Sequence, residues 1–277
     1  MTGILTAELT KMRKRTGLTV IHLVWPLLTF LFGYLANYLF RNTDGLPPDV
    51  QEGIVASILP DQFVANAISG FSIFGFALAL IFGALSVGSE YGWGTVGNLL
   101  IQSPTRLQVH VGRIGALLVQ SFIMTTTALG VSAAGAALFG SLLDETLVWP
   151  PTGEIVRGLA AGWLILSVAI VIGATAALFL RGTALAIGLG LVYVLVVESL
   201  FAGFAGASSI VESIAEFLPG VNSGALATAV QNASAPESLT PPGGALVDGG
   251  HATAVLFGYL LVLLLAGAAA FNRRDVA

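Results

Sequence analysis

The hydrophobic residues of this chain lie in six long runs that are separated by more polar segments. The runs cover residues 18–40, 63–88, 111–143, 156–180, 183–207 and 252–271. Each run is long enough to be a transmembrane helix, because about 20 apolar residues cross the hydrocarbon core of a bilayer. A transmembrane β-barrel would instead show segments of about ten residues with alternating hydrophobicity. The pattern therefore predicts an all-α integral membrane protein with six transmembrane helices, in a single transmembrane domain over residues 1–277.

The composition excludes a soluble domain. Hydrophobic residues make up 56% of the chain and charged residues 9%, whereas a soluble domain has about 25% charged residues. The chain has no cysteine, which rules out disulfides, thiolate metal sites and a cysteine nucleophile. Its three histidines, His22, His110 and His251, lie in separate segments without metal-ligand spacing. We therefore expect no catalytic residue, no metal site and no nucleic-acid partner.

The basic residues predict the orientation of the chain in the membrane. With the N-terminus inside, nine of the eleven lysines and arginines fall on the cytoplasmic side, which obeys the positive-inside rule. These nine residues are Lys11, Arg13, Lys14, Arg15, Arg106, Arg113, Arg181, Arg273 and Arg274. The prediction is a multi-pass protein of the cell inner (plasma) membrane with both termini cytoplasmic. The first apolar run exceeds the 7–15 residues of a signal-peptide core, so we expect it to be retained as an anchor.

Two segments outside the runs have a helical pattern of their own. In residues 1–17, Leu5, Leu9 and Met12 form one apolar stripe, and three cations, Lys11, Lys14 and Arg15, lie off it. This predicts an amphipathic helix in the cytoplasmic headgroup layer, with its cations facing anionic lipid; the simpler alternative is charge that only sets the topology. The large extracytoplasmic loop, residues 208–251, holds two stretches that could each form a short helix, divided by Pro219 and Gly220.

The segment between the second and third runs, residues 90–108, breaks the apolar pattern. Thr95 is a suitable N-cap, and Val96, Leu99 and Leu100 form an apolar face at i, i+3 and i+4. Pro104 ends the helix, because the residue before a proline avoids the α region. The segment thus predicts a short, partly apolar helix beneath the membrane, which would be a docking surface for a soluble partner.

This segment resembles the signature of ABC-2 type permeases, the membrane subunits of ABC exporters. The shared pattern is E-Y-x-x-G-T-x-x-x-L-L-x-x-x-P-x-R, here Glu90, Tyr91, Gly94, Thr95, Leu99, Leu100, Pro104 and Arg106. The resemblance extends to the basic N-terminal helix, the six spans, the large loop after the fifth span and the C-terminal F-x-R-R-D at 271–275. One departure is Arg113, where the family more usually has a lysine.

The resemblance implies a function and a set of partners. The helix between spans two and three would be the coupling helix, which fits a groove on the ATPase subunit, and residues 90–108 would be the coupling segment. Lys11, Lys14 and Arg15 would contact that subunit or the membrane surface, and the loop before the last span would form outer re-entrant helices. A second permease chain, identical or related, would complete the pathway.

The chain itself lacks the residues that ATP hydrolysis needs. A phosphate-binding loop has the pattern G-x-x-x-x-G-K-[ST], with a lysine that contacts the phosphates. The only lysines, Lys11 and Lys14, do not lie in such a pattern. No cofactor is therefore expected in this chain, and ATP and Mg²⁺ would bind to the separate ATPase partner.

Glu198 is the one acidic residue well inside an apolar run, and intramembrane acids often belong to a transport pathway. It could equally reach interfacial water or a polar partner at the outer end of its span. The leading hypothesis is a permease subunit that exports an apolar or amphipathic substrate such as a drug, lipid or peptide. The alternatives are an ATP-independent secondary transporter or channel with Glu198 in its pathway, and a membrane scaffold that only recruits a partner.

Small residues recur at four-residue spacing within the runs, which permits close packing of helices. The pairs and triplets are Ser132, Ala136 and Gly140; Ala184 and Gly188; and Ala186 and Gly190. Packing within the chain is the expected use of this spacing.

Overall fold

The computed structural model describes residues 2–43, 45–92, 105–231, 236, 239 and 246–273. Over these residues the chain forms helices and no strands. Six helical segments are long and apolar enough to cross a membrane, which confirms the predicted all-α class and the number of spans. These segments are Thr16–Phe40, Pro60–Gly92, Arg106–Leu142, Thr152–Leu180, Thr183–Ala207 and Gly249–Ala270.

Three of the six spans are single helices, and three contain a π-helical turn. The single helices are α8 (Arg106–Leu142), α9 (Thr152–Leu180) and α14 (Gly249–Arg273). Span one consists of α2 (Thr16–Phe30), η1 (Leu31–Leu35) and α3 (Ala36–Phe40); span two of η2 (Pro60–Gln62), α5 (Phe63–Ser69), η3 (Phe71–Gly75) and α6 (Phe76–Gly92); and span five of α10 (Thr183–Val192), η4 (Tyr193–Val197), α11 (Glu198–Phe204) and η5 (Ala205–Ala207). The π turns are η1, η3 and η4, and such turns are frequent at functional sites.

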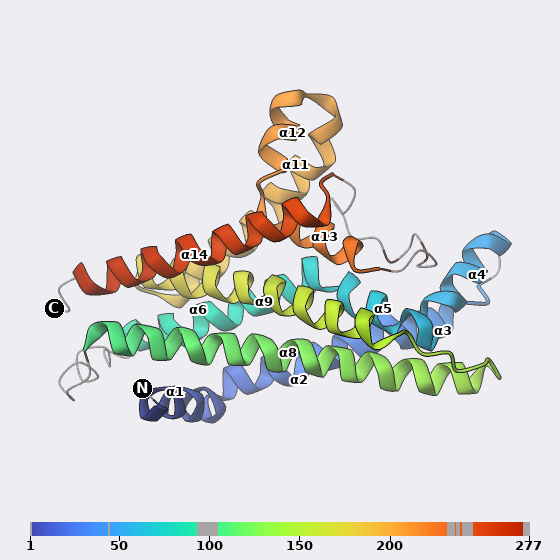
Figure 1. The fold of residues 1–277 in the computed structure, drawn as a ribbon, viewed down its shortest axis with the longest axis horizontal. Coiled ribbons are helices and arrows are strands. Elements are labelled where there is room, and N and C mark those ends of the chain that lie inside the picture. Colours follow the sequence, from blue (N-terminus) through green and yellow to red (C-terminus); the bar gives the residue numbers. More distant parts are fainter. Residues whose placement is uncertain are drawn as a thin grey trace.

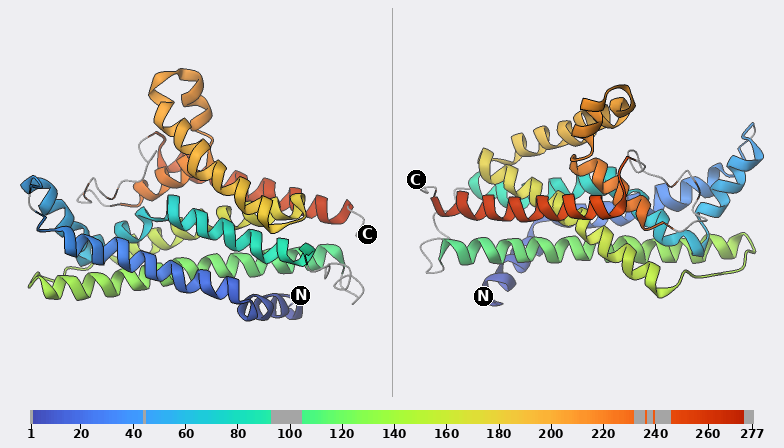
Figure 2. Two further views of the ribbon diagram at one scale, coloured as in Figure 1. Left: turned by 180° about the vertical axis from the view of Figure 1, so that it is seen from behind. Right: turned by 45° about the horizontal axis from the view of Figure 1, so that its top comes forward.

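Spans one, two, three, four and six run side by side along the long axis of the molecule, whereas span five slants away from the bundle at its C-terminal end (Figures 1 and 2). Helix α1 (Thr2–Lys14), the C-terminal end of α14, the end of α6 and the start of α8 all lie at one end of this bundle (Figures 1 and 2). Helix α4 (Pro48–Ser57) lies at the opposite end. Elements that sequence reasoning assigned to the cytoplasmic side are therefore gathered at one end of the bundle.

Helix α9 is the centre of the bundle. In the most apolar 18-residue stretch of α9, 67% is buried, against 17% in the corresponding stretches of spans five and six. On one side it crosses α6 so closely that a Cβ on Gly83 would overlap the carbonyl oxygen of Ile170, and a Cβ on Gly173 would overlap that of Leu80. The two backbones are therefore in direct contact, which only glycine permits at this distance.

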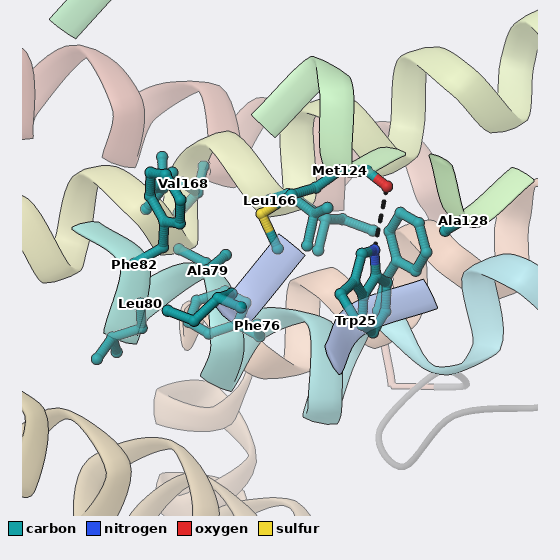
Figure 3. Packing of buried hydrophobic residues seen from close by; sticks show 14 of the residues in the cluster. Trp25, Phe76, Ala79, Leu80, Phe82, Met124, Ala128, Leu166 and Val168 are labelled. Carbon is teal, nitrogen blue, oxygen red and sulfur yellow. Dashed lines mark hydrogen bonds between the residues drawn. The ribbon is translucent and has the colours of Figure 1, made fainter. Parts of the chain in front are cut away.

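The buried side chains around this crossing form one continuous hydrophobic core (Figure 3). Phe76, Leu80 and Phe82 of α6 pack in this core together with Leu166 of α9. Trp25 of α2 is also buried, and its indole nitrogen donates a hydrogen bond of 3.0 Å to the carbonyl oxygen of Met124. This bond satisfies the single donor of the ring inside the core.

Helix α8 is longer than a bilayer requires. Its 37 residues span about 55 Å at 1.5 Å per residue, against a hydrocarbon core of about 30 Å. A reciprocal capping box fixes its first turn, in which the Thr105 hydroxyl accepts from the backbone N–H of Gln108 (3.3 Å) and the Gln108 side chain accepts from that of Thr105 (3.1 Å). The N-terminus of α8, which follows the 93–104 segment in the chain, is therefore well capped.

The loop before span six contains two short helices, α12 (Ser209–Ala215) and α13 (Pro219–Ala229). Pro219 and Gly220 do not divide them, as the sequence suggested, but begin α13, where the first helical position suits a proline. Helices α11 and α12 form a hairpin that stands away from the bundle, whereas α13 lies against it (Figures 1 and 2). That either helix is re-entrant in a bilayer remains a prediction.

Candidate functional site

Three elements bring their charged side chains to the carboxylate of Glu90, near the end of α6. Lys11 of α1 pairs with Glu90 Oε1, and Arg113 of α8 pairs with Glu90 Oε2. Arg15, between α1 and α2, lies 3.4 Å from Glu90 Oε1. Glu90 and Arg113 are almost completely buried, at 2% and 4% exposure. We call Glu8, Lys11, Arg15, Glu90 and Arg113 the Glu90 cluster.

Arg15 fixes the joint between α1 and α2. Its backbone is extended (φ −88°, ψ 112°), which breaks the helix there. Its guanidinium donates 2.8 Å hydrogen bonds to the carbonyl oxygen of Ser86 and to the hydroxyl of Ser89, both on α6. Partial burial lowers the pKa of Arg15 and the neighbouring Glu90 carboxylate opposes this effect; the guanidinium stays charged at any physiological pH.

Glu8 completes the cluster from α1. Its carboxylate lies 2.5 Å from the Lys11 ammonium, one helical turn away, and Glu8 is 4% exposed. Three cations and two acids leave the cluster with a net charge of +1. Buried charges are stable only when they are paired, so each member depends on the others.

Apolar contacts hold α1 in the same place. Met12 is buried, and Leu5 and Leu9 pack against the core, so the apolar stripe faces the protein's own helices. A Cβ on Gly112 of α8 would come within 2.5 Å of Ile4. Helix α1 is thus seated on the first turns of α8 as well as tied to α6.

The structure brings together only part of the predicted coupling set. Glu90, Arg15 and Lys11 meet in the cluster, whereas Lys14 is exposed on α1. Tyr91 is half-buried against the core, and Arg106 is half-buried at the start of α8. The remaining predicted residues lie outside the described part of the chain: Gly94, Thr95, Val96, Leu99, Leu100 and Pro104.

Sequence reasoning missed the roles of Arg113 and Glu8. Arg113 was predicted only to be a cytoplasmic cation in place of the usual lysine, yet it is the most buried cation of the cluster. A charge inside an apolar run signals a buried partner. Glu8 and Lys11, spaced for an ion pair on one helix face, were also visible in the sequence.

The residue predicted for a transport pathway, Glu198, lies in span five. It is 4% exposed at the start of α11, and its carboxylate faces the backbone of Gly220 and Val221 and the hydroxyl of Tyr193. Neither carboxylate oxygen has a partner with good hydrogen-bond geometry among the described residues. The first turn of α13, with its positive dipole end, thus faces an acid.

The cavity beside Glu198 has a volume of about 50 Å³, which suits ordered water but not a drug-sized molecule. A role of Glu198 in a pathway remains a prediction.

Replacement of Glu198 by alanine should loosen α13. The positive dipole end of α13 would lose the carboxylate that faces it, which costs about 0.3–2 kcal/mol of the free energy of unfolding. Glu198→Gln keeps an oxygen facing this helix end and should retain part of that stability. The free energy of unfolding, from SDS titration in mixed micelles, measures both effects, and exposed Glu212 of α12 supplies the neutral control, Glu212→Ala. Unchanged transport by Glu198→Gln would remove the pathway role.

Comparison with known proteins identifies a family that this chain matches. Residues 4–197 match a family described as ABC-2 family transporter protein. The match covers more than half of the chain and includes the whole Glu90 cluster, and it ends just before Glu198. No curated protein matches the chain.

Proposed function

This chain belongs to the ABC-2 transporter family and is a permease component, not an ATPase, and from that premise we propose that it couples ATP hydrolysis on a separate subunit to export across the membrane. The six apolar spans support a multi-pass membrane location. Family membership favours this function over the ATP-independent transporter and the passive scaffold. ATP and Mg²⁺ would bind to the partner subunit only.

The Glu90 cluster is the observation that carries the proposal. It ties α1, α6 and α8 together directly beside both ends of the 93–104 segment. An ATPase that docks on this segment and on α1 would therefore push on one rigid joint. Because α1 continues through Arg15 into span one, closure of the ATPases would move spans one, two and three together as near-rigid rods.

The orientation follows from the same proposal. The ATPase acts in the cytoplasm, so the end of the bundle that carries the Glu90 cluster would be cytoplasmic. The exposed cations Arg13 and Lys14 of α1 would then face either anionic headgroups or the ATPase.

A second permease chain would complete the pathway, whether identical or related. The hairpin of α11 and α12 supports this, because it stands away from the bundle with exposed apolar residues. These residues include Leu200, Phe204 and Ile210, at 53%, 60% and 71% exposure. Such a hairpin can pack against another chain as well as against lipid.

Affinity purification of the chain from its native membrane in mild detergent tests the proposal. We expect a soluble subunit with a phosphate-binding loop to copurify in stoichiometric amount, as identified by mass spectrometry. Replacement of Leu99 and Leu100 by glutamate should reduce its capture at least tenfold, because charge would be buried in an apolar docking face.

The matched control is Val148→Glu. Val148 is exposed in the connection from α8 to α9, at the far end of α8 from the docking segment. A chain that purifies intact but without an ATPase, under conditions that preserve a known ABC complex, would contradict the proposal. Equal capture by the wild-type chain and the Leu99 and Leu100 variant would contradict the docking role of this segment.

A further inference from the structure

Spans one and two, with Leu239 of the loop before span six, line a half-open cavity of about 320 Å³ that is separate from the Glu90 cluster. Its volume lies in the range of small-molecule sites. Its lining is amphipathic, with aromatic walls and neutral polar side chains and, among the described residues, no ionisable group. The residues that matter here are Trp25, Thr29, Phe32, Asn66, Ser69 and Phe74.

A π turn from each of the two spans contributes to the lining of the cavity. Phe32 and Gly33 belong to η1, and Ile73 and Phe74 belong to η3. The rings of Phe32 and Phe74 stack with their centroids 5.8 Å apart and an interplanar angle of 7°. Both rings are about half exposed, so the aromatic pair is open to a further ring.

The hydrogen-bond donors of the hydroxyl and indole groups that line the cavity are already used. The Thr29 hydroxyl donates to the carbonyl oxygen of Trp25 (3.1 Å), and the Ser69 hydroxyl donates to that of Asn66 (2.8 Å). The indole of Trp25 donates to Met124, on the side away from the cavity lining. The two hydroxyls can therefore offer a ligand only oxygen lone pairs, and the indole nitrogen offers it no hydrogen bond.

The amide donors are used as well. The Asn66 side-chain nitrogen donates to the carbonyl oxygens of Gly33 and Ser57, both at 2.9 Å, and the Asn37 nitrogen donates to Gly33 at 2.9 Å. Two carbonyl partners fix the orientation of the Asn66 amide, because only its nitrogen can donate to them. Asn66 Oδ1 is therefore left as an acceptor.

Asn66 Oδ1 is buried and has no hydrogen-bond partner among the described residues. A Cβ on Gly33 would come within 2.5 Å of it, so this oxygen packs against the backbone of Gly33, where only a glycine leaves space for it. Asn66 itself is 4% exposed. A buried acceptor without a partner is costly, and a ligand that donates to it would recover that cost.

We propose that this cavity is a binding site for the transported molecule, an apolar, ring-bearing compound with hydrogen-bond donors and no acidic group. The identification as a transport site rests on the proposed function. The acceptors for the ligand's donors are Asn66 Oδ1 and the hydroxyl oxygens of Thr29 and Ser69, and its ring packs on Phe32 and Phe74. An acid is excluded because the lining offers acceptors and no cation.

Photolabelling of the purified chain in phosphatidylcholine nanodiscs tests the site without ATP or an ATPase. The probe is 4-octylphenol with a diazirine in its alkyl chain, and mass spectrometry locates the label. We expect label on residues 25–37 and 66–74, displaced by excess 4-octylphenol. The methyl ether 4-octylanisole and the anion 4-octylbenzoate should compete at least about fivefold less well, because each lacks the donor.

Matched variants separate the site from general effects on the fold. Phe32→Ala should weaken labelling about tenfold, with Phe122→Ala as its control, since Phe122 is a similarly exposed ring on α8. Thr29→Val should weaken it about threefold to fivefold. Its control is Thr127→Val, because Thr127 also donates to the carbonyl four residues before it. Both controls should label like the wild type.

Several results would overturn the proposal. One is label spread over lipid-facing residues such as Leu185 and Leu265 in proportion to their exposure. Another is equal competition by 4-octylanisole, which would show that the site does not recognise the hydrogen-bond donor of the ligand. Localised label in a chain that captures no ATPase would overturn the proposed function but keep the binding site, whereas capture without localised label would overturn the site alone.

Discussion

Replacement of Glu90 by glutamine is expected to cost about 3–5 kcal/mol of the free energy of unfolding and to abolish ATP-coupled transport. Removing one partner of a buried ion pair leaves uncompensated charge in a medium of low dielectric constant. In this chain the effect falls on three cations, Lys11, Arg15 and Arg113, which would retain Glu8 as their one acidic neighbour in the cluster. Glutamine keeps the size of the side chain, so the change is one of charge.

The measurement is SDS-titration unfolding in mixed micelles, together with ATP-dependent transport by the chain reconstituted with the ATPase that it captures. Glu52→Gln is the matched control, because Glu52 is an exposed acid of α4 at the opposite end of the bundle. The double variant Glu90→Gln, Arg113→Gln should recover part of the lost stability, because it also removes the most buried of the three cations that pair with Glu90. A Glu90→Gln chain as stable as the wild type would show that the carboxylate contributes nothing net to this joint.

The number of spans could be predicted from the sequence because the bilayer imposes a length and a composition on every crossing. Partners in the folded state are not imposed in this way. Glu90 was singled out, but Lys11 is 79 residues away and Arg113 is 23 residues away. Lys11 and Lys14 look alike in the sequence, yet only Lys11 reaches the acid, because the position of α1 on α8 decides which of them faces α6.

The π turns and the cavity between spans one and two could not be predicted either. No residue type encodes a π turn by itself, and the apolar pattern continues unchanged through 31–35 and 71–75. Asn66 was not singled out, although its amide ties span two to Gly33 in span one. Intramembrane amides are a weaker signal than intramembrane charges, but here one of them lines the cavity of about 320 Å³ between spans one and two.

Small-residue spacing was an equally poor guide to the closest helix contact. Ser132, Ala136 and Ala186 are buried, and a Cβ on Gly140 or Gly190 would clash with Leu147 or Leu80, as the spacing suggested. A Cβ on Gly188, however, would meet nothing within 4 Å. The closest backbone contacts are instead those of Gly83 with Ile170 and of Gly173 with Leu80, which no spacing rule singled out. In a chain with 34 glycines, spacing alone does not separate a crossing point from a helix face.

Replacement of Gly83 or Gly173 by alanine is expected to force α6 and α9 apart. The added Cβ would overlap a backbone carbonyl oxygen, which cannot rotate away as a side chain can. Overpacking of a tight contact costs about 1–3 kcal/mol, and more when a backbone must shift. We expect each variant to lose at least that much free energy of unfolding, and to give a lower yield of monodisperse protein in mild detergent.

Gly130→Ala supplies the control, because a Cβ on Gly130 of α8 would meet nothing within 4 Å. Alanine is the better helix former by about 0.5–1 kcal/mol, so this variant should be as stable as the wild type or slightly more stable.

The double variant Gly83→Ala, Gly173→Ala tests the geometry of the crossing itself. The two glycines face each other's helices at one contact, so the first Cβ already separates the backbones and the second finds room. Its cost should therefore be clearly less than the sum of the two single costs, as expected for sites that share one backbone shift. Strictly additive costs would mean that each glycine makes an independent contact, and that α6 and α9 do not move as one pair of packed rods. In that case displacement of α6 at the Glu90 cluster would not be passed to α9 at this crossing.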